Sequence, residues 1–312
     1  MKVLLTGATG FIGSALTKEL ESKGYSIRIV SRNNSRDYDT VICNLGVEKI
    51  PESAFDSVDI VFHLAGYTHD LENNKNRDAI YQKLNVKATI DLIKAASKQR
   101  VRKFIFISSV KAGGINQQAV DMSEDDQLEP SDIYGKTKRK AEISILSIGK
   151  EYGIDVSIVR PALVYGVNMK GNLASMFDSV KNGWFPPLPQ TYNSRSMISV
   201  IDLVTAIILI TENKKTDQNI YIATDGCNYS SRDIFDAMCL VNGKKIPNWE
   251  VPYLIFLMLA RTGDIFKFLP FNTHKCKKIF GSEAYSSEKL HKLGFLPKYS
   301  FTSYFQQYNN GK

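Results

Sequence analysis

The sequence has 312 residues, of which 43% are hydrophobic and 23% charged, as in a globular protein that can bury a sizeable core. The net charge of +8 is spread along the chain, and no basic stripe interleaved with aromatic residues indicates a nucleic-acid surface. The four cysteines lack metal-ligand spacing, and the N-terminus does not resemble a signal peptide. We therefore predict a cytoplasmic protein with reduced thiols, no metal site and a small anionic substrate.

In the first half of the chain, short apolar runs alternate with segments of helical spacing. The predicted strands are 2–6, 26–31, 39–45, 58–66, 102–109 and 154–161. The predicted helices are 11–24, 76–99 and 131–153. This alternation predicts right-handed crossovers and an α/β fold of Rossmann type, a doubly wound parallel sheet covered by helices on both faces.

The alternation loosens after Pro161, and we predict a smaller C-terminal α+β lobe that binds substrate. The features predicted there are a proline-rich loop at 186–195, a helix at 199–210 and a strand at 218–224. We assign 1–165 to a dinucleotide-binding domain to which 196–212 returns, and 166–195 and 213–312 to the substrate lobe.

The apolar segment 251–260 has about half the length that a bilayer crossing requires. It predicts a buried helix or a partner-facing surface, with contact to a membrane surface as the alternative. No integral membrane segment is predicted.

Three glycines, Gly7, Gly10 and Gly13, stand directly between the first predicted strand and the first predicted helix. In this context the spacing is typical of dinucleotide binding: one glycine permits the tight turn, one admits the pyrophosphate, and one lets helix and strand pack closely. The free N–H groups and the dipole of the helix favour the phosphates. The alternative is a glycine turn that binds no ligand.

The end of the second predicted strand bears on the choice between NAD and NADP. An NAD site usually has an acidic residue there for the ribose 2′-hydroxyl, whereas this chain has Ser31 and Arg32 and no carboxylate before Asp37. Because a guanidinium suits a 2′-phosphate, we favour NADP and keep NAD as the alternative, in which Arg32 stacks on the adenine.

Tyr134 and Lys138 are four residues apart on a predicted helix and therefore share a face. A tyrosine has a pKa near 10, and a nearby ammonium is expected to lower it, so that the phenol can exchange a proton with a substrate hydroxyl. Ser108 and Ser109 end the fifth predicted strand, at the sheet edge where ligands bind in this fold. The alternative is an ordinary surface helix.

These motifs together resemble the extended short-chain dehydrogenases/reductases of the NAD-dependent epimerase/dehydratase family, in the branch of UDP-glucose 4-epimerase-like proteins and UDP-4-keto-sugar reductases. The matching segments span residues 4 to about 205 and are "TGATGFIG", "VFHLAG", "LNVKAT", "FIFISS", "YGKTK", "RPALVYG" and "RSMISVIDLV". The resemblance implies a homodimer formed through helices 76–99 and 131–153. Some proteins of this branch are implicated in making amino-deoxy sugars for surface polysaccharides.

The resemblance also implies roles for individual residues. Ser109, Tyr134 and Lys138 match the catalytic residues. Ser109 and Tyr134, together with Asn172 and Arg195 near the diphosphate, are expected to bind a nucleotide sugar, with UDP as its nucleotide. The expected cofactor contacts are Gly7, Gly10, Phe11, Ile12, Gly13, Ser31, Arg32, Asn44, Leu45, Leu64, Ala65, Gly66, Asn85, Tyr134, Lys138 and Pro161.

The family's dehydratases carry an Asp-Glu pair where this chain has Val110 and Lys111, so dehydration is not expected. Two reactions at C4 of the sugar remain. The one-way reduction of a 4-keto sugar suits NADPH and is favoured by the missing acid near Ser31, whereas 4-epimerisation with retained NAD is the alternative. Reduction of an apolar ketone and a redox-silent NADP-sensing regulator are lesser alternatives. His63 is predicted to pack in the core.

Overall fold

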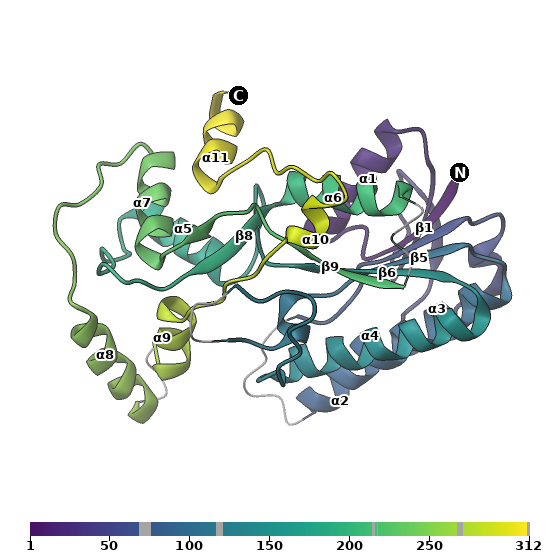
Figure 1. The fold of residues 1–312 in the computed structure, drawn as a ribbon, viewed down its shortest axis with the longest axis horizontal. Coiled ribbons are helices and arrows are strands. Elements are labelled where there is room, and N and C mark those ends of the chain that lie inside the picture. The colour runs from purple at the N-terminus through teal and green to yellow at the C-terminus, as the bar shows by residue number, and fades with distance from the viewer. Residues whose placement is uncertain (69–75, 117–120, 214–215, 217, 267–270, 311–312) are drawn as a thin grey trace.

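The structure is a computed structural model that describes residues 1–68, 76–116, 121–213, 216, 218–266 and 271–310. Its centre is a seven-stranded parallel sheet with the order β3-β2-β1-β4-β5-β6-β9, which confirms the predicted Rossmann-type fold (Figure 1). The strands are β1 (Lys2–Thr6), β2 (Ser26–Ser31), β3 (Asp39–Ile42), β4 (Ile60–His63), β5 (Lys103–Ile107), β6 (Asp155–Pro161) and β9 (Asn219–Ala223).

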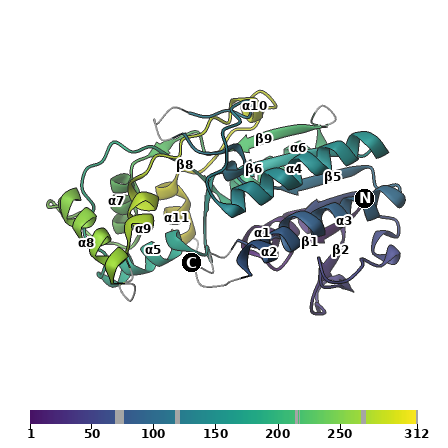
Figure 2. The same cartoon turned by 90° about the horizontal axis from the view of Figure 1, so that it is seen from below.

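Successive strand residues point to opposite faces of this sheet, and apolar side chains lie on both faces. Helices therefore cover the sheet on both sides. Val3 and Leu5 of β1 pack in a core with α1 (Phe11–Ser22) and α6 (Val200–Glu212). Leu4 packs in the other core with α3 (Ala88–Lys98) and α4 (Ile133–Tyr152). Figure 2 shows α3 and α4 lying along the sheet on one side.

The predicted helix 76–99 consists of three consecutive pieces. These are α2 (Arg77–Tyr81), a π-helical turn (Gln82–Lys87) and α3. Because a π turn widens the helix and often marks a functional position, the location of Asn85 within it is relevant to the site. Two short 3₁₀ helices lie at Glu52–Phe55 and Val110–Gly113.

The lobe has its own core around Tyr165, Met197 and Phe301. Its three-stranded sheet has the order β10-β8-β7 and consists of β7 (Leu163–Tyr165), β8 (Arg195–Ser199) and β10 (Asn228–Tyr229). Its helices and those at the end of the chain are α5 (Asn172–Asn182), α7 (Ser231–Val241), α8 (Tyr253–Ile265), α9 (Thr273–Phe280), α10 (Glu288–His291) and α11 (Phe301–Asn310).

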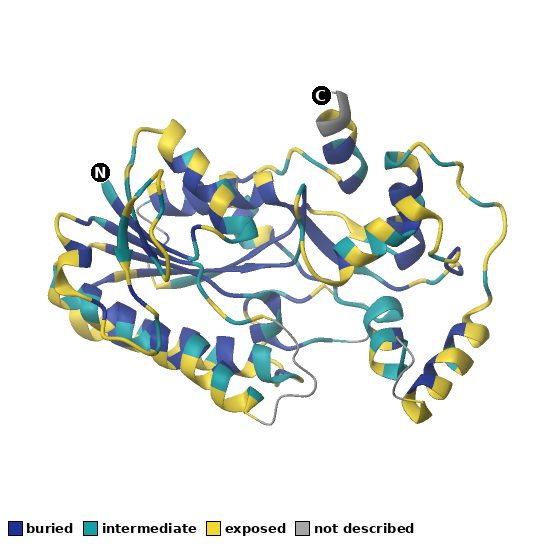
Figure 3. Cartoon of the chain, turned by 180° about the vertical axis from the view of Figure 1, so that it is seen from behind, coloured by how far each residue is buried: buried dark blue, intermediate teal, exposed yellow. Residues whose placement is uncertain are grey.

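Two predictions for the second half need correction. β9 pairs in parallel with β6, so this strand belongs to the main sheet although it lies in the segment assigned to the lobe. The apolar segment 251–260 is not a buried helix, because most of α8 is exposed, as the yellow parts of the helix in Figure 3 show. In the described part of the chain, no helix combines the length and apolar character needed to cross a bilayer.

Candidate active site

The turn between β1 and α1 has the geometry that its glycines suggested. Gly7 has φ +74°, and a Cβ there would lie 2.7 Å from the Ala65 nitrogen in the loop after β4. A Cβ on Gly13 would lie 2.0 Å from the Gly7 carbonyl oxygen, so α1 approaches β1 as only glycine allows. Gly10 is the N-cap of α1 and provides no side-chain hydrogen bond to its N–H groups.

These residues fit a dinucleotide. The uncapped start of α1 presents N–H groups that suit a pyrophosphate, and Phe11 and Ile12 begin the helix there. Leu64, Ala65 and Gly66 follow β4, which pairs directly with β1. The predicted phosphate turn and the predicted ribose loop are therefore neighbours at the carboxyl edge of the sheet.

The adenosine end of the predicted site is more open. Ser31 is the last residue of β2, and the exposed Arg32 follows it. Asn44 is also exposed, and its backbone N–H donates to the Glu48 carboxylate at 2.6 Å. No carboxylate occupies the end of β2, so the structure retains the feature on which the NADP prediction depends.

Asn85 connects the loop after β4 to α4. Its Oδ1 accepts a hydrogen bond from the Tyr67 N–H at 2.6 Å, and its Nδ2 donates to the Tyr67 carbonyl at 3.1 Å and to Thr137 Oγ1 at 3.3 Å. Because the Asn85 side chain is buried and both of its polar atoms are used within the protein, its observed role is to position the Tyr67 loop beside α4.

The three predicted catalytic residues converge at the carboxyl end of β5. The Ser109 hydroxyl lies close enough to the Tyr134 hydroxyl to favour its ionised form, and Ser109 Oγ accepts a hydrogen bond from the Lys111 N–H at 3.3 Å. Lys138 Nζ donates to the Ile107 carbonyl at 2.8 Å and lies 4.4 Å from the centre of the Phe106 ring. A phenol, a hydroxyl and an amine thus lie at one end of one strand.

The electrostatics of the pair correct one expectation. Burial raises the pKa of Tyr134 above its ordinary value, while the hydrogen bond from Ser109 acts in the opposite direction. Burial also lowers the pKa of Lys138 to about 8, against the charge of Glu142. The pKa of Tyr134 is thus raised overall, against the expected lowering, and the Lys138 amine donates to the Ile107 carbonyl.

The aromatic surroundings of Tyr134 include one residue that sequence reasoning missed, Tyr81. The ring of Tyr81 lies 6.4 Å from that of Tyr134 and 5.1 Å from that of Tyr67. Ser108 Oγ is buried and has no hydrogen-bond partner among the described residues. Tyr81 could have been found from its spacing, since it precedes Asn85 by four residues and so shares its side of the helix.

Asp132 caps the N-terminus of α4 and accepts from the Gly135 N–H at 2.7 Å. Its carboxylate also pairs with Lys111 at 3.2 Å. Burial raises the pKa of Asp132, but Lys111, the Gly135 N–H and Lys278 of α9 outweigh it and hold the pKa below its ordinary value. The charge of a residue far along the chain thus acts on the helix end that carries Tyr134.

The two predicted diphosphate contacts lie in the lobe. Asn172 is the exposed first residue of α5. Arg195 begins β8, and its Nη1 donates to the carbonyls of Lys278 and, at 3.4 Å, Ile279. Among the described residues, no hydrogen bond or ion pair joins Asn172 or Arg195 to Tyr134. Their role in binding therefore stays a prediction.

Two further positions named from the sequence, Pro161 and His63, are buried and packed within the protein. Pro161 ends β6 opposite Ala223 of β9 and is buried. His63, as predicted, packs in the core: its ring nitrogens lie 2.6 Å from Thr6 Oγ1 and 2.8 Å from Thr89 Oγ1.

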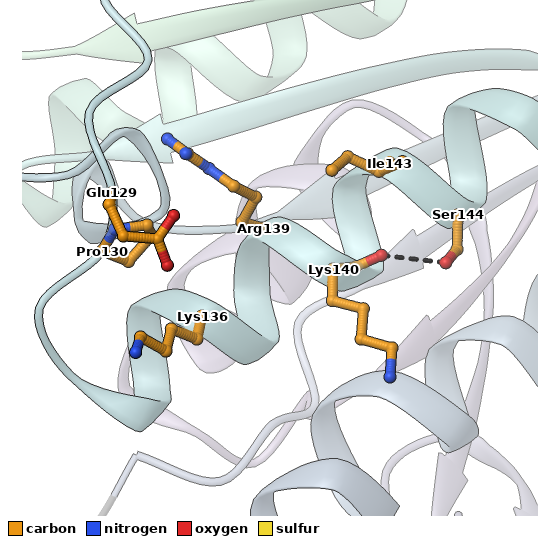
Figure 4. A pocket seen from close by; sticks show the side chains of 7 residues that line it. All are labelled: Glu129, Pro130, Lys136, Arg139, Lys140, Ile143 and Ser144. Atoms are coloured by element: carbon orange, nitrogen blue, oxygen red, sulfur yellow. Dashed lines mark hydrogen bonds between the residues drawn. The ribbon is translucent and has the colours of Figure 1, made fainter.

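A surface depression on α4 is separate from this site. It is lined by Glu129, Pro130, Lys136, Arg139, Lys140, Ile143 and Ser144 (Figure 4). Lys136, Lys140 and Ile143 follow one another at helical spacing on the side of α4 away from Tyr134 and Lys138. This side of the helix does not contribute to the catalytic group.

Comparison with known proteins adds a family and several relatives. Residues 3–223 match the NAD dependent epimerase/dehydratase family. A UDP-glucose 4-epimerase of Vibrio cholerae is 30% identical over 277 residues, which cover 84% of this chain and 83% of the relative. An N-acetyl-α-D-glucosaminyl-diphospho-ditrans,octacis-undecaprenol 4-epimerase of Escherichia coli O157:H7 is 25% identical over 309 residues, which cover 96% and 92% of the two chains.

Among solved structures, the fold is similar to a UDP-glucuronic acid 4-epimerase of Bacillus cereus in complex with UDP-glucuronic acid and NAD. The TM-score is 0.78 with 18% sequence identity, and the alignment covers 100% of both chains. At this identity the likeness supports the fold.

Proposed function

Because the chain belongs to the NAD dependent epimerase/dehydratase family, we propose that this enzyme interconverts the two C4 epimers of a nucleotide sugar. The observation that carries the proposal is the convergence of Ser109, Tyr134 and Lys138 at the end of β5, at the sheet edge that also bears the Gly7 turn. The 4-epimerase relatives from V. cholerae and E. coli support the same reaction at C4.

In this reaction Tyr134 exchanges one proton with the substrate. Its phenolate oxygen removes the proton of the C4 hydroxyl as C4 loses a hydride, and the phenol returns the proton when the ketone is reduced from the opposite face. Ser109 Oγ holds the same substrate oxygen by a hydrogen bond. A bound nicotinamide dinucleotide supplies the acceptor and donor of the hydride. Lys138 orients this end of α4 and contributes positive charge when protonated.

The oxidation half-reaction requires the Tyr134 proton to leave first. Burial opposes that loss, and the neighbouring Ser109 hydroxyl favours it. The pKa of Lys138, lowered to about 8, means that its positive charge diminishes as the pH rises through 8. A reaction that uses the positive charge of Lys138 is therefore expected to slow as the pH rises through 8.

The group beyond the sugar is proposed to be a diphosphate, with UDP as the favoured carrier. Arg195 is the proposed diphosphate contact, since its guanidinium lies where α9 meets the lobe sheet. The V. cholerae relative acts on a UDP sugar, whereas the E. coli relative acts on a sugar joined through diphosphate to a polyprenol. Both carriers therefore belong in the substrate test.

A second candidate is the NADPH-dependent reduction of a 4-keto sugar. The observation that favours it is the exposed Arg32 after β2, in a place where no carboxylate stands to bind a ribose 2′-hydroxyl. Such a reductase uses the same Ser109, Tyr134 and Lys138 but transfers hydride once. Dehydration is not proposed, because Val110 and Lys111 occupy the positions of the carboxylates that it needs.

The nucleotide released from the denatured protein separates the two candidates. We expect a 4-epimerase to release NAD and to convert UDP-glucose or UDP-N-acetylglucosamine to its C4 epimer without added cofactor. A protein that is isolated empty, binds NADPH more tightly than NADH and loses this preference in Arg32→Asp is a reductase. A protein that binds neither dinucleotide contradicts both proposals.

We also propose a cytoplasmic location. The four cysteines are free thiols in the structure, as in proteins of a reducing compartment.

A further inference from the structure

The outer face of α8 is the feature that the proposed reaction does not explain. Seven apolar residues there are between 40% and 74% exposed: Tyr253, Leu254, Ile255, Met258, Leu259, Ile265 and Phe266, which directly follows the helix. Their recurrence at spacings of three and four residues puts most of them on one side of the helix. Monomeric proteins rarely expose so many contiguous apolar side chains without a partner.

The inner side of the same helix is packed. Phe256 and Ala260 are buried, and the ring of Phe256 lies 5.3 Å from that of Phe280 in α9. Tyr253 also meets Phe280, at 5.1 Å. The inner side of α8 therefore packs against α9. The outer side is exposed although the helix is attached to the rest of the lobe. Figures 1 and 2 both place α8 at the end of the molecule that is distant from the main sheet.

The charges next to this face are mostly positive. Arg261 on α8 and Lys277 on α9 are exposed, and residues 271–280 contain three lysines and no acidic residue. Asp264, the acidic residue of α8, is also exposed and keeps its charge, because hydrogen bonds from Thr273 lower its pKa. An apolar helix face with an excess of cations beside it is the pattern of helices that lie in the headgroup region of anionic membranes.

Self-association explains the pattern less well. In a symmetric dimer the same patch occurs on both subunits, so the excess of positive charge beside α8 would face the same excess on the second subunit. An anionic lipid surface instead offers apolar chains to the face and negative headgroups to its border. At 13 residues α8 can lie along such a surface, and it is too short to cross it.

The position of α9 connects this face to the candidate active site. Its last residues, Lys278 and Ile279, accept hydrogen bonds from Arg195. Lys278 is also close enough to Asp132, the cap of the helix that bears Tyr134, to stabilise its carboxylate. One helix thus touches the predicted diphosphate contact on one side and α8 on the other. We propose that the apolar face of α8, with the cations of α8 and α9, docks this protein onto an anionic lipid bilayer.

Vesicle binding tests the proposal without reference to activity. The full-length protein is mixed with vesicles of phosphatidylcholine alone or of phosphatidylcholine and phosphatidylglycerol in equal parts, and bound protein is measured by flotation. We expect binding to the anionic vesicles that weakens with salt. The double variant Leu254→Ser, Met258→Ser is expected to bind at least about tenfold less tightly, because it loses two apolar anchors.

Three control variants and one further test variant make the result specific. Leu240→Ser and Leu296→Ser change exposed apolar residues outside α8 and are expected to bind like the parent. Lys277→Glu is expected to weaken binding to anionic vesicles. Tyr134→Phe is expected to bind normally, so docking is tested separately from the proposed function. An unchanged melting temperature shows that the double variant is folded, as expected for substitutions at exposed positions.

Two outcomes overturn the proposal. One is a parent protein that does not float with anionic vesicles, and the other is a folded double variant that floats as well as the parent. If the unbound parent forms a dimer that the double variant dissolves, a second copy of the chain is the partner of α8.

Discussion

At the level of single residues, Tyr134 is the group on which the proposed chemistry depends. It lies near Ser109 and on a helix whose start is fixed by the Asp132 cap. Burial raises the pKa of Tyr134, while the Ser109 hydroxyl opposes this shift.

Tyr134→Phe is therefore expected to lower turnover about 10²–10⁴-fold. Dinucleotide binding should remain, because the Gly7 turn and Arg32 are untouched. The matched control is Tyr152→Phe, which changes an exposed tyrosine near the other end of α4 and should leave turnover as it is. Epimerisation or ketone reduction is measured together with binding of NAD or NADPH. Full turnover in Tyr134→Phe would remove the basis of the mechanism.

His63 makes a different prediction, about stability. Burial first, and then the charge of Lys138, lower the pKa of His63 from 6.5 to about 3. Below pH 6.5 the unfolded state therefore binds a proton at His63 that the folded state does not bind. The free energy of unfolding consequently decreases as the pH is lowered from 6.5 to 3, and His63 has no effect on it above pH 6.5. This contribution amounts to about 1.4 kcal/mol per pH unit.

The comparison is between the parent and His63→Asn in denaturant unfolding at pH 7.5 and pH 5. We expect the parent to lose about 2 kcal/mol more than the variant over this interval, irrespective of their stabilities at pH 7.5. His274→Asn, at an exposed position, should retain the slope of the parent. Parallel pH dependences of the parent and His63→Asn would contradict the assignment.

At the level of elements, the parallel strands and the glycine turn could be read from the sequence because local patterns determine them. β1 is a short apolar run, and it is followed directly by Gly7, whose positive φ is typical of a tight turn. Neither the packing of α8 nor the sheet position of β9 is local. An apolar run such as 251–260 predicts burial, and only its one-sided contact with α9 shows that the other side is left open.

The β1–α1 turn permits a sharp test of close packing. In Gly13→Ala the added Cβ would meet the Gly7 carbonyl oxygen at 2.0 Å, so α1 has to move away from β1. We expect a loss of about 1–3 kcal/mol in the free energy of unfolding and a marked loss of dinucleotide affinity. Ser14→Ala, at the next and exposed position, is the control. Parent-like dinucleotide affinity in Gly13→Ala would show that this approach does not matter for binding.

At the level of the whole molecule, the candidate site draws on groups that are far apart in the sequence. Tyr134, Asn85 and the loop after β4 meet because β4 and β5 are neighbours in the sheet. The sequence named these residues by motif, but the hydrogen bonds that Lys138 and Arg195 make within the protein required the fold. Spacing along one helix predicts which residues share a side of that helix. It does not predict which residues of other elements they contact.

The predicted homodimer would join α3 and α4 of two copies, and the surface of α4 shows what such contact involves. Ile143 is 63% exposed there, beside the depression that Lys136 and Lys140 help to line. A two-fold axis near this surface brings lysines of both copies together, so the apolar contact forms against charge repulsion. The dimer is therefore expected to tighten as salt is added.

Raising the salt concentration from about 0.01 M to about 0.1 M shortens the screening length from about 30 Å to about 10 Å. Over that range we expect the dimer fraction in analytical ultracentrifugation to increase, opposite to the weakening expected for vesicle binding through α8. Ile143→Ser should shift the equilibrium towards the monomer because it removes the apolar contact without adding charge. Leu296→Ser changes an exposed leucine far along the chain and should leave the equilibrium unchanged. A dimer that dissociates as salt rises, or that tolerates Ile143→Ser, would mean that the subunits meet through a different surface.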